Sequence, residues 1–243
     1  MLPFHRLYSY GFMVSLGLLS EIISWLDAFV CWNRLLTRDE FMFQLTLDPP
    51  TADWLRAFYR DLSGVILEYG SGGSSVLALS TNSKNQLYSC ETDALWLARL
   101  SSFLTAEGLS DRFHPLHCDV GPTKEWGYPD FTRADFTHDR GTQFLMSAWR
   151  PWNVLRAQKI NPEFVLIDGR WRVPSFLATV INCQSPVKIL FDDYLERKHY
   201  HVVESIQAPS RMIGRAALFE IEPKDESARN FLANYLPLFL QPG

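Results

Sequence analysis

Short apolar runs alternate with longer segments of mixed polarity from Asp53 onward, a pattern typical of βα units around a parallel sheet. Three of the five runs are almost continuously apolar, as expected for strands that helices cover on both faces. The predicted strands are residues 64–69, 86–90, 113–118, 163–167 and 187–191. The predicted helices between them are residues 74–80, 93–107, 143–158 and 173–182.

Two later runs, residues 201–206 and 216–221, predict an antiparallel pair that closes the sheet, and residues 225–240 predict a terminal helix. Residues 120–142 show no periodicity, which is typical of a functional lid, a binding loop or a disordered segment. The fold class is therefore α/β, a Rossmann-like doubly wound and mostly parallel sheet with a late antiparallel strand.

The N-terminal segment, residues 12–32, is mostly apolar over about the length of one membrane span. Glu21 and Asp27 lie within it, and a carboxylate at the bilayer centre costs about 2.5 to 3.5 kcal/mol. Apolar side chains recur at intervals of three and four, so we expect an amphipathic accessory helix. It would cover the core, form a subunit interface in a homo-oligomer or lie on a membrane surface. The predicted division is an accessory segment at residues 1–50 and a Rossmann-like domain at residues 51–243.

The amino-acid composition excludes several classes of protein and of partner. The chain has 243 residues, of which 47% are hydrophobic and 21% charged, so disorder, collagen and coiled coil are excluded. The 23 basic and 27 acidic residues include no basic run, so a nucleic-acid partner is not expected. The four cysteines are far apart, which excludes a zinc ribbon and a dense disulfide framework and favours a reducing, cytoplasmic location. They are Cys31, Cys90, Cys118 and Cys183.

A strand, a glycine turn and a helix follow one another in residues 65–75, which read VILEYGSGGSS. Glycine lets backbone amides approach a ligand, and a helix N-terminus carries partial positive charge, so the turn predicts an anionic or carboxylate-bearing cofactor. A tight turn that binds no nucleotide would look similar. Two acids strengthen the prediction: Glu68 precedes the turn, and Glu91 follows the second strand, where an acid can accept both ribose hydroxyls.

These residues resemble the E/D-x-G-x-G motif of class I S-adenosylmethionine-dependent methyltransferases, a resemblance that covers roughly residues 47–223. It implies that the turn at residues 70–75 wraps the methionine part of S-adenosylmethionine and that Glu91 holds the ribose. It also implies that Asp119 lies near adenine and Asp168 beside the transferred methyl. Ser74 replaces the third glycine of the fuller pattern. The candidate cofactor-binding residues are Glu68, Tyr69, Gly70, Ser71, Gly72, Ser74, Ser75, Glu91, Asp119 and Asp168.

The strand ends at residues 167–169 (IDG) and 192–194 (DDY) resemble those of O-methyltransferases that act on sugars and other small hydroxylated substrates. Asp168, Asp192 and Asp193 are the catalytic candidates, because ligands of open α/β sheets bind outside these strand ends. They would bind the substrate or move its proton, hold a divalent cation as in catechol-type enzymes, or cap nearby helices. No metal is predicted. His199 is a further catalytic candidate, and either it or His201 would serve as a general base.

Several nearby side chains allow two interpretations. The resembling pattern often has a histidine after IDG, whereas this chain has Arg170 and Arg172, which would bind an anionic substrate group or pair with the neighbouring acids. Trp126 and Tyr128 would stack on a sugar ring or adenine, or simply anchor their loop. Residues 48–51 (DPPT) predict a turn into the helix at Asp53.

The sequence therefore predicts an S-adenosylmethionine-dependent methyltransferase, with O-methylation of a small-molecule or glycan hydroxyl. A non-catalytic methyltransferase-like protein used for binding or assembly is one alternative. A dinucleotide-dependent oxidoreductase is another, disfavoured because Ser75 stands where a G-x-G-x-x-G motif has glycine and because Glu68 precedes the turn. The acceptor is not encoded in any motif.

Overall fold

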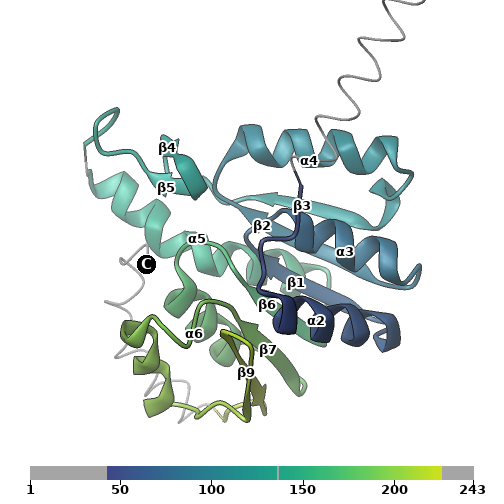
Figure 1. Ribbon diagram of the computed structural model, residues 1–243. Coiled ribbons are helices and arrows are strands. Elements are labelled where there is room, and N and C mark those ends of the chain that lie inside the picture. The colour runs from purple at the N-terminus through teal and green to yellow at the C-terminus, as the bar shows by residue number, and fades with distance from the viewer. Residues whose placement is uncertain (1–42, 136, 226–243) are drawn as a thin grey trace, which may run out of the picture. The chain divides into compact units, whose positions relative to one another are not determined.

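The computed structural model describes residues 43–135 and 137–225 (Figure 1). The strands of the main sheet are β1 (Val65–Tyr69), β2 (Gln86–Glu91), β3 (Phe113–His117), β6 (Phe164–Ile167), β7 (Val187–Phe191), β8 (Arg211–Ile213) and β9 (Ala216–Ile221). The helices are α2 (Pro49–Asp61), α3 (Gly73–Thr81), α4 (Ala94–Ala106), α5 (His138–Ala157) and α6 (Arg172–Asn182). Three short 3-10 segments are η1 (Ser110–Arg112), η2 (Glu125–Gly127) and η3 (Lys198–Ser205), and β4 (Thr123–Lys124) pairs with β5 (Tyr128–Pro129).

The seven-stranded sheet has the order β3-β2-β1-β6-β7-β9-β8. The first five strands in this order are parallel, and β9 runs antiparallel to both β7 and β8. The order reverses between β1 and β6, where open α/β sheets bind their ligands. The predicted fold class is confirmed, including the late antiparallel strand.

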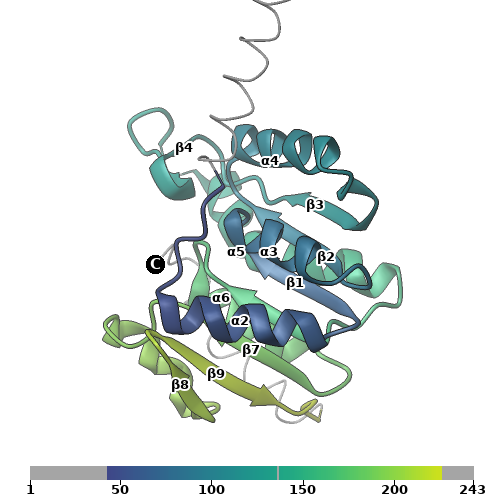
Figure 2. The same ribbon diagram turned by 45° about the vertical axis from the view of Figure 1, so that its right-hand side comes forward.

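Helices cover both faces of the sheet. Figures 1 and 2 show α2, α3 and α4 on one face and α5 and α6 on the other. On the second face Leu67, Val165 and Ile189 pack in one buried cluster with residues of α5 and α6. On the first face Phe164 meets the aromatic rings of α2. Burial on both faces is the physical reason that these strands are short and almost entirely apolar.

Four of the predicted helices and all five predicted parallel strands are confirmed, with shifts at their ends. α2 begins at Pro49, four residues before the predicted start, because proline suits the first turn of a helix. α5 begins at His138, so the aperiodic segment is shorter than predicted, and it contains the β4–β5 pair.

The prediction of a strand at residues 201–206 is wrong. These residues belong to the 3-10 segment η3, in which Tyr200 and Val203, three positions apart, are buried. The strand that pairs with β9 is β8, because Gly214, at φ +57°, allows a tight turn directly before β9. The tight turn at Gly214 thus places residues 211–213, rather than residues 201–206, beside β9.

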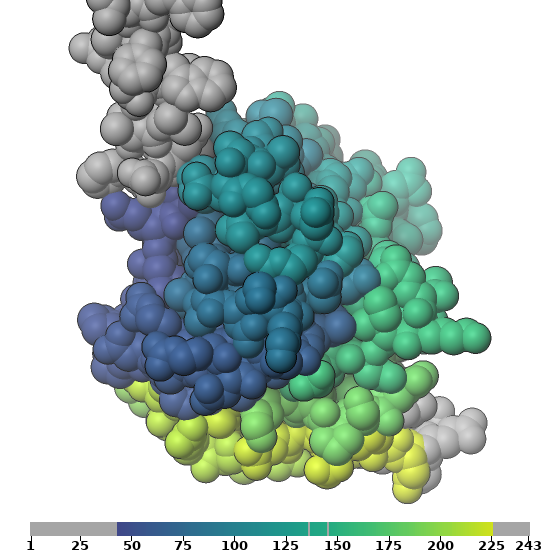
Figure 3. Space-filling model, turned by 90° about the vertical axis from the view of Figure 1, so that its right-hand side faces the viewer, coloured from purple at the N-terminus to yellow at the C-terminus, as the bar shows by residue number. Residues whose placement is uncertain are grey.

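The start and end of the domain lie side by side. Thr51 in α2 donates a hydrogen bond to the carbonyl of Ile213 in β8 at 2.7 Å and also bonds Asp48. Figure 3 shows the blue surface of α2 next to the yellow-green C-terminal strands. The described residues from Leu45 onward form one compact unit. The DPPT segment therefore forms the N-cap and first turn of α2, rather than the predicted turn before a helix at Asp53.

Three predictions concern the ends of the chain. The N-terminal helix at residues 12–32 lies outside the described residues, and so does the terminal helix predicted at residues 225–240, apart from Asp225. The division at residue 50 stays a prediction. Within residues 43–135 and 137–225, no helix is long and apolar enough to cross a membrane.

A disulfide joins Cys90 at the end of β2 to Cys118 just after β3, with their Cα atoms 6.2 Å apart. The two strands are adjacent, and Cys90 pairs in register with Leu116. Cys90 and Cys118 directly precede Glu91 and Asp119, two acids that the sequence analysis selected. The spacing of the cysteines along the chain gave no indication of this pair.

Candidate functional site

The glycine turn after β1 touches the loop after β6. Gly70 has φ +94°, and a Cβ atom placed on it would lie 2.5 Å from the backbone nitrogen of Gly169 and 2.6 Å from its Cα. The amide of Asp168 donates to the carbonyl of Tyr69 at 2.9 Å, which continues the β1–β6 pairing. The contact of these two glycines therefore holds the turn beside Asp168.

Glu68 lies behind the turn rather than in it. Its carboxylate is fully buried and accepts hydrogen bonds from three serine hydroxyls, at 2.5 Å from Ser74 and Ser89 and from Ser75 as well. Both oxygens are thus engaged by the protein. Burial raises the pKa of Glu68 to about 7, against the lowering effect of the three serine hydrogen bonds. Glu68 braces the start of α3, and its predicted contact with the cofactor remains untested.

We expect Glu68→Gln to remove a pH dependence of stability. A carboxyl whose pKa rises on folding from 4.5 to about 7 favours the folded state at pH below 4.5, and this contribution is lost as the pH rises to 7. At about 1.4 kcal/mol per unit, the loss amounts to about 3 kcal/mol. Urea unfolding at pH 5 and pH 8 measures it, and the wild type should lose about this much more stability than the variant. Equal losses in the two proteins would contradict the prediction.

Glu91 is half-buried at the end of β2, with its carboxylate held by backbone amides. One oxygen accepts from the amides of Thr92 at 2.6 Å and Asp93 at 3.0 Å, and the other from Ser71 at 3.1 Å. Burial raises the pKa of Glu91, and these N–H bonds offset the effect in part. The bond to Ser71 ties the acid to the glycine turn, so the structure brings these two predicted parts together.

The remaining residues of the turn divide into those that face the core and those that face outward. The Tyr69 side chain is buried and donates to the carbonyl of Ala148 in α5 at 2.6 Å, so it lies away from the turn. A Cβ atom on Gly72 would meet only the Trp96 ring, at 3.9 Å. The first backbone amides of a helix have no partner within that helix. Here the amide of Ser75 donates to the carbonyl of Gly72, so the amides of Gly73 and Ser74 are left for a ligand. A side chain at Gly72 would therefore meet no backbone, in contrast to one at Gly70.

Asp119 follows β3 and is exposed. It accepts hydrogen bonds from the amide of Gly121 at 2.8 Å and from the side chain of Gln143 in α5 at 3.2 Å. A pocket lies beside it, lined in part by Cys118, Gln143 and Met146. Sequence reasoning missed the two α5 residues, although their spacing of three positions places them on one helix face.

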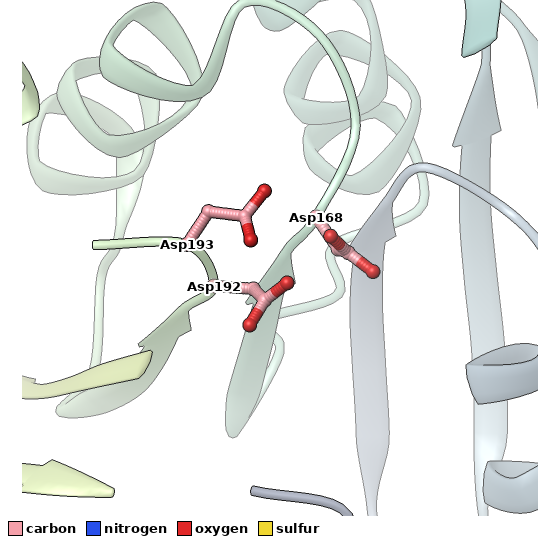
Figure 4. Close-up of side chains that lie close together, drawn as sticks. All are labelled: Asp168, Asp192 and Asp193. Carbon is pink, nitrogen blue, oxygen red and sulfur yellow. The ribbon is translucent and has the colours of Figure 1, made fainter. Parts of the chain in front are cut away.

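The three candidate aspartates converge at the ends of β6 and β7 (Figure 4). One carboxylate oxygen from each of Asp168, Asp192 and Asp193 lies within 4.8 Å of the others. Asp193 has a left-handed backbone, φ +56°, as does Trp171 at φ 55° after β6. Such conformations are costly in non-glycine residues and cluster at functional sites. The structure therefore brings the three candidate acids together.

Three arginines surround the aspartates. Arg172, with a side chain only 4% exposed, lies within 4.0 Å of all three carboxylates. Arg215, from the turn between β8 and β9, bonds both oxygens of Asp192 at 2.9 and 2.6 Å. Arg197 pairs with Asp193 at 2.9 Å. Of the two interpretations given to Arg172, the structure supports pairing with the neighbouring acids.

The carboxyl groups differ in pKa. Burial raises the pKa of Asp168 well above its ordinary value, and the charges of Asp192 and Asp193 add to this against the opposing effect of Arg172. Burial acts in the same direction on Asp192, but hydrogen bonds from Arg215 and Asp168 outweigh it and lower its pKa. The surroundings therefore disfavour the charge on Asp168 and favour the charge on Asp192.

The histidines lie apart from this cluster. His199 is exposed on η3 and lies against Tyr200, with ring centroids 4.2 Å apart and the ring planes tilted by 58°. In the described part of the chain, no hydrogen bond or ion pair joins His199 to the aspartates. His201 approaches the carbonyl of Tyr194 at 3.0 Å and stacks on its ring. The structure therefore does not bring either histidine together with the aspartates.

Arg170 has a different environment from Arg172. Its Nε donates to the carbonyl of Trp126 at 3.0 Å, and its guanidinium lies 4.7 Å from the centre of the Tyr128 ring. It forms no ion pair with a carboxylate of the described residues. Trp126 has φ +62° and is 75% exposed. The positive charge of Arg170, two residues after Asp168, therefore lies at the rim of the site next to the exposed indole of Trp126.

Two further arginines were missed by sequence reasoning. Arg140 is buried and donates to the carbonyls of Val120 at 3.2 Å and Pro122 at 3.0 Å, so it organises the loop before α5. Arg215 reaches Asp192 across 23 positions. Neither belongs to a motif, and only the folded arrangement gives them partners.

The chain is similar to solved structures of methyltransferases. No protein-family model matches the chain, and no curated protein matches it. Among solved structures, a methyltransferase-like protein from Silicibacter pomeroyi is 33% identical over 83% of this chain and 99% of that one, with a TM-score of 0.68. The O-methyltransferase of Bacillus cereus in complex with SAH is 13% identical over 78% of this chain and 89% of that one, with a TM-score of 0.52. The O-methyltransferase TomG of Streptomyces achromogenes, in complex with SAM, is 13% identical over 74% and 82%, with a TM-score of 0.50.

The identity with the Silicibacter protein extends over almost all of the described domain, and the two O-methyltransferases share the fold. The chain belongs to the class I S-adenosylmethionine-dependent methyltransferase superfamily.

Proposed function

We propose that this protein transfers the methyl group of S-adenosylmethionine to a hydroxyl of a small molecule or glycan. The observation that carries the proposal is that the Gly70 turn, Glu91 and the Asp168 cluster meet at one edge of the sheet, where its strand order reverses. A non-catalytic relative would not need a buried acid of raised pKa beside the glycine turn. An oxidoreductase remains disfavoured by Ser75, whose hydroxyl holds the amide of Gly72 and bonds Glu68.

The residues present fit this cofactor. The amides at the start of α3 would hold the methionine carboxylate, because a helix N-terminus favours an anion. Glu91 would accept the ribose hydroxyls, and the pocket beside Asp119 would take adenine. At Gly72 a Cβ atom would contact only the Trp96 ring, at 3.9 Å, so no backbone of the described residues crowds that position. The bound cofactor supplies an electrophilic methyl on a sulfonium.

The remaining chemistry falls to the chain's own side chains. A hydroxyl nucleophile must be aligned and must lose its proton, and a carboxylate within hydrogen-bond reach can accept that proton. Asp168 fits this role because it lies beside the glycine turn, and its raised pKa makes its carboxylate a stronger base than that of an ordinary aspartate. Asp192, paired with Arg215, would stay ionised while Asp168 takes up the proton.

The rim of the site favours an acceptor with a ring and an anionic group. Trp126 offers an exposed indole face on which a sugar ring can stack. Arg170 offers terminal N–H groups that no carboxylate of the described residues neutralises, and guanidinium binds carboxylate or phosphate in a bidentate manner. The proposal also places the reaction in the cytoplasm and excludes nucleic acid as an acceptor. It further includes self-association through the N-terminal segment.

Calorimetry with S-adenosylmethionine tests the proposal directly. We expect the wild type to bind the cofactor and Glu91→Ala to weaken binding at least tenfold, because each ribose hydroxyl bonded to a charged group contributes about 1.5 to 3 kcal/mol. Glu125→Gln changes an exposed acid of the β4–β5 segment and serves as the matched control. A folded wild type that binds no cofactor would refute the proposed function, whereas normal binding by Glu91→Ala would refute only the role of Glu91.

A further inference from the structure

The three aspartates form the kind of oxygen cluster that holds a divalent cation in catechol-type methyltransferases. One oxygen of each lies within 4.8 Å of the others, which is compatible with shared coordination of Mg²⁺ or Mn²⁺. The contacts of Arg172 decide whether such an ion fits this chain.

Arg172 lies among these oxygens. Its Nη2 is 3.1 Å from an oxygen of Asp168 and 3.0 Å from one of Asp193, and its Nη1 is 3.9 Å from one of Asp192. Arg172 also donates to three backbone carbonyls at the same strand ends, at 2.5 Å to Asp192, 2.9 Å to Gly169 and 3.1 Å to Asp168. Every nitrogen of the guanidinium therefore already has an oxygen partner.

The charges of the cluster are already balanced. Three carboxylates face three guanidinium groups, because Arg215 binds Asp192 and Asp193 while Arg197 binds Asp193. A divalent ion among the carboxylates would stand next to a buried guanidinium that cannot lose its proton. The residues present therefore do not fit a divalent cation.

We infer that Arg172 is the built-in cation of this site, which holds Asp168, Asp192 and Asp193 in place and excludes a divalent metal ion. Arg172 is a positioning residue: it orients Asp168 from the protein side and reaches no acceptor itself, since its side chain is 4% exposed. The inference adds to the proposed methyl transfer and rests on it only for the consequence that the reaction needs no metal.

Binding of Mn²⁺, followed by electron paramagnetic resonance of the full-length protein, tests this inference. We expect the wild type to bind no Mn²⁺ at the cluster below millimolar concentration. Arg172→Ala should bind one ion at least tenfold more tightly, because its three carboxylates then have an excess of negative charge. The double variant Arg172→Ala with Asp192→Asn should lose that gain. Arg170→Ala, which removes a neighbouring arginine that contacts none of the carboxylates, should behave as the wild type.

Two results would overturn the inference. One is tight binding of Mn²⁺ by the wild type that Asp192→Asn abolishes. The other is a folded Arg172→Ala that binds Mn²⁺ no better than the wild type. Should Arg172→Ala fail to fold, the wild-type titration decides the question alone. Neither measurement uses S-adenosylmethionine, so failure of the proposed methyl transfer would be seen separately.

Discussion

Gly70→Ala is expected to destabilise the protein by about 3 to 5 kcal/mol and to abolish cofactor binding. The new Cβ atom would lie 2.5 Å from the nitrogen of Gly169, and that contact is with backbone, which cannot rotate away. A residue with a side chain at φ +94° adds strain of about 1 to 3 kcal/mol, and overpacking costs a similar amount. Urea unfolding and calorimetry with S-adenosylmethionine measure the two effects.

Gly72→Ala is the matched comparison within the same motif. Gly72 has φ 169°, an extended conformation open to any residue, and its Cβ would meet only Trp96 at 3.9 Å. Stability should therefore change by less than about 1 kcal/mol. Because the added methyl would stand next to the amides proposed to hold the methionine carboxylate, cofactor affinity should fall at least tenfold. Equal losses of stability in the two variants would contradict this separation of roles.

Asp168→Asn is expected to lower the rate of methyl transfer by about 10²- to 10⁴-fold with little change in stability, the range reported for loss of a general base. Burial already favours the neutral form of Asp168, so a neutral amide of the same shape should be accepted by the fold. The rate is measured as transfer of labelled methyl from S-adenosylmethionine to the best acceptor in a panel of hydroxylated small molecules and glycans.

The pH dependence of this rate separates proton transfer from simple positioning. A base acts in its ionised form, and the pKa of Asp168 is raised, so wild-type activity should fall as the pH drops through that value. The residual activity of Asp168→Asn should lack this titration. Asp193→Asn is the control, because asparagine tolerates φ +56° and Asp193 serves mainly as an ion-pair partner. A loss at Asp193 as large as that at Asp168 would assign catalysis to the charge of the cluster as a whole.

The sequence was sufficient to predict those residues of the candidate site that lie at the ends of strands. Three of these residues directly follow strands β1, β6 and β7, namely Gly70, Asp168 and Asp192. Glu91 is the last residue of β2, and Asp119 lies two residues after β3. Parallel strands place such positions at one edge of the sheet. The role of Glu68 could not be predicted in this way, since an acid before the turn and an acid behind it look alike in sequence. Its three serine partners come from two separate elements, α3 and β2.

The sequence by itself determined the parallel sheet, its covering helices and the glycine turn, because local apolar periodicity and glycine conformation are properties of neighbouring residues. Only the tertiary structure decided which polar side chains become partners. Arg215 reaches Asp192 because β9 lies antiparallel beside β7, and Arg172 turns inward while Arg170 turns to the rim. Ion pairs across the fold depend on sheet order and burial, which no local pattern contains.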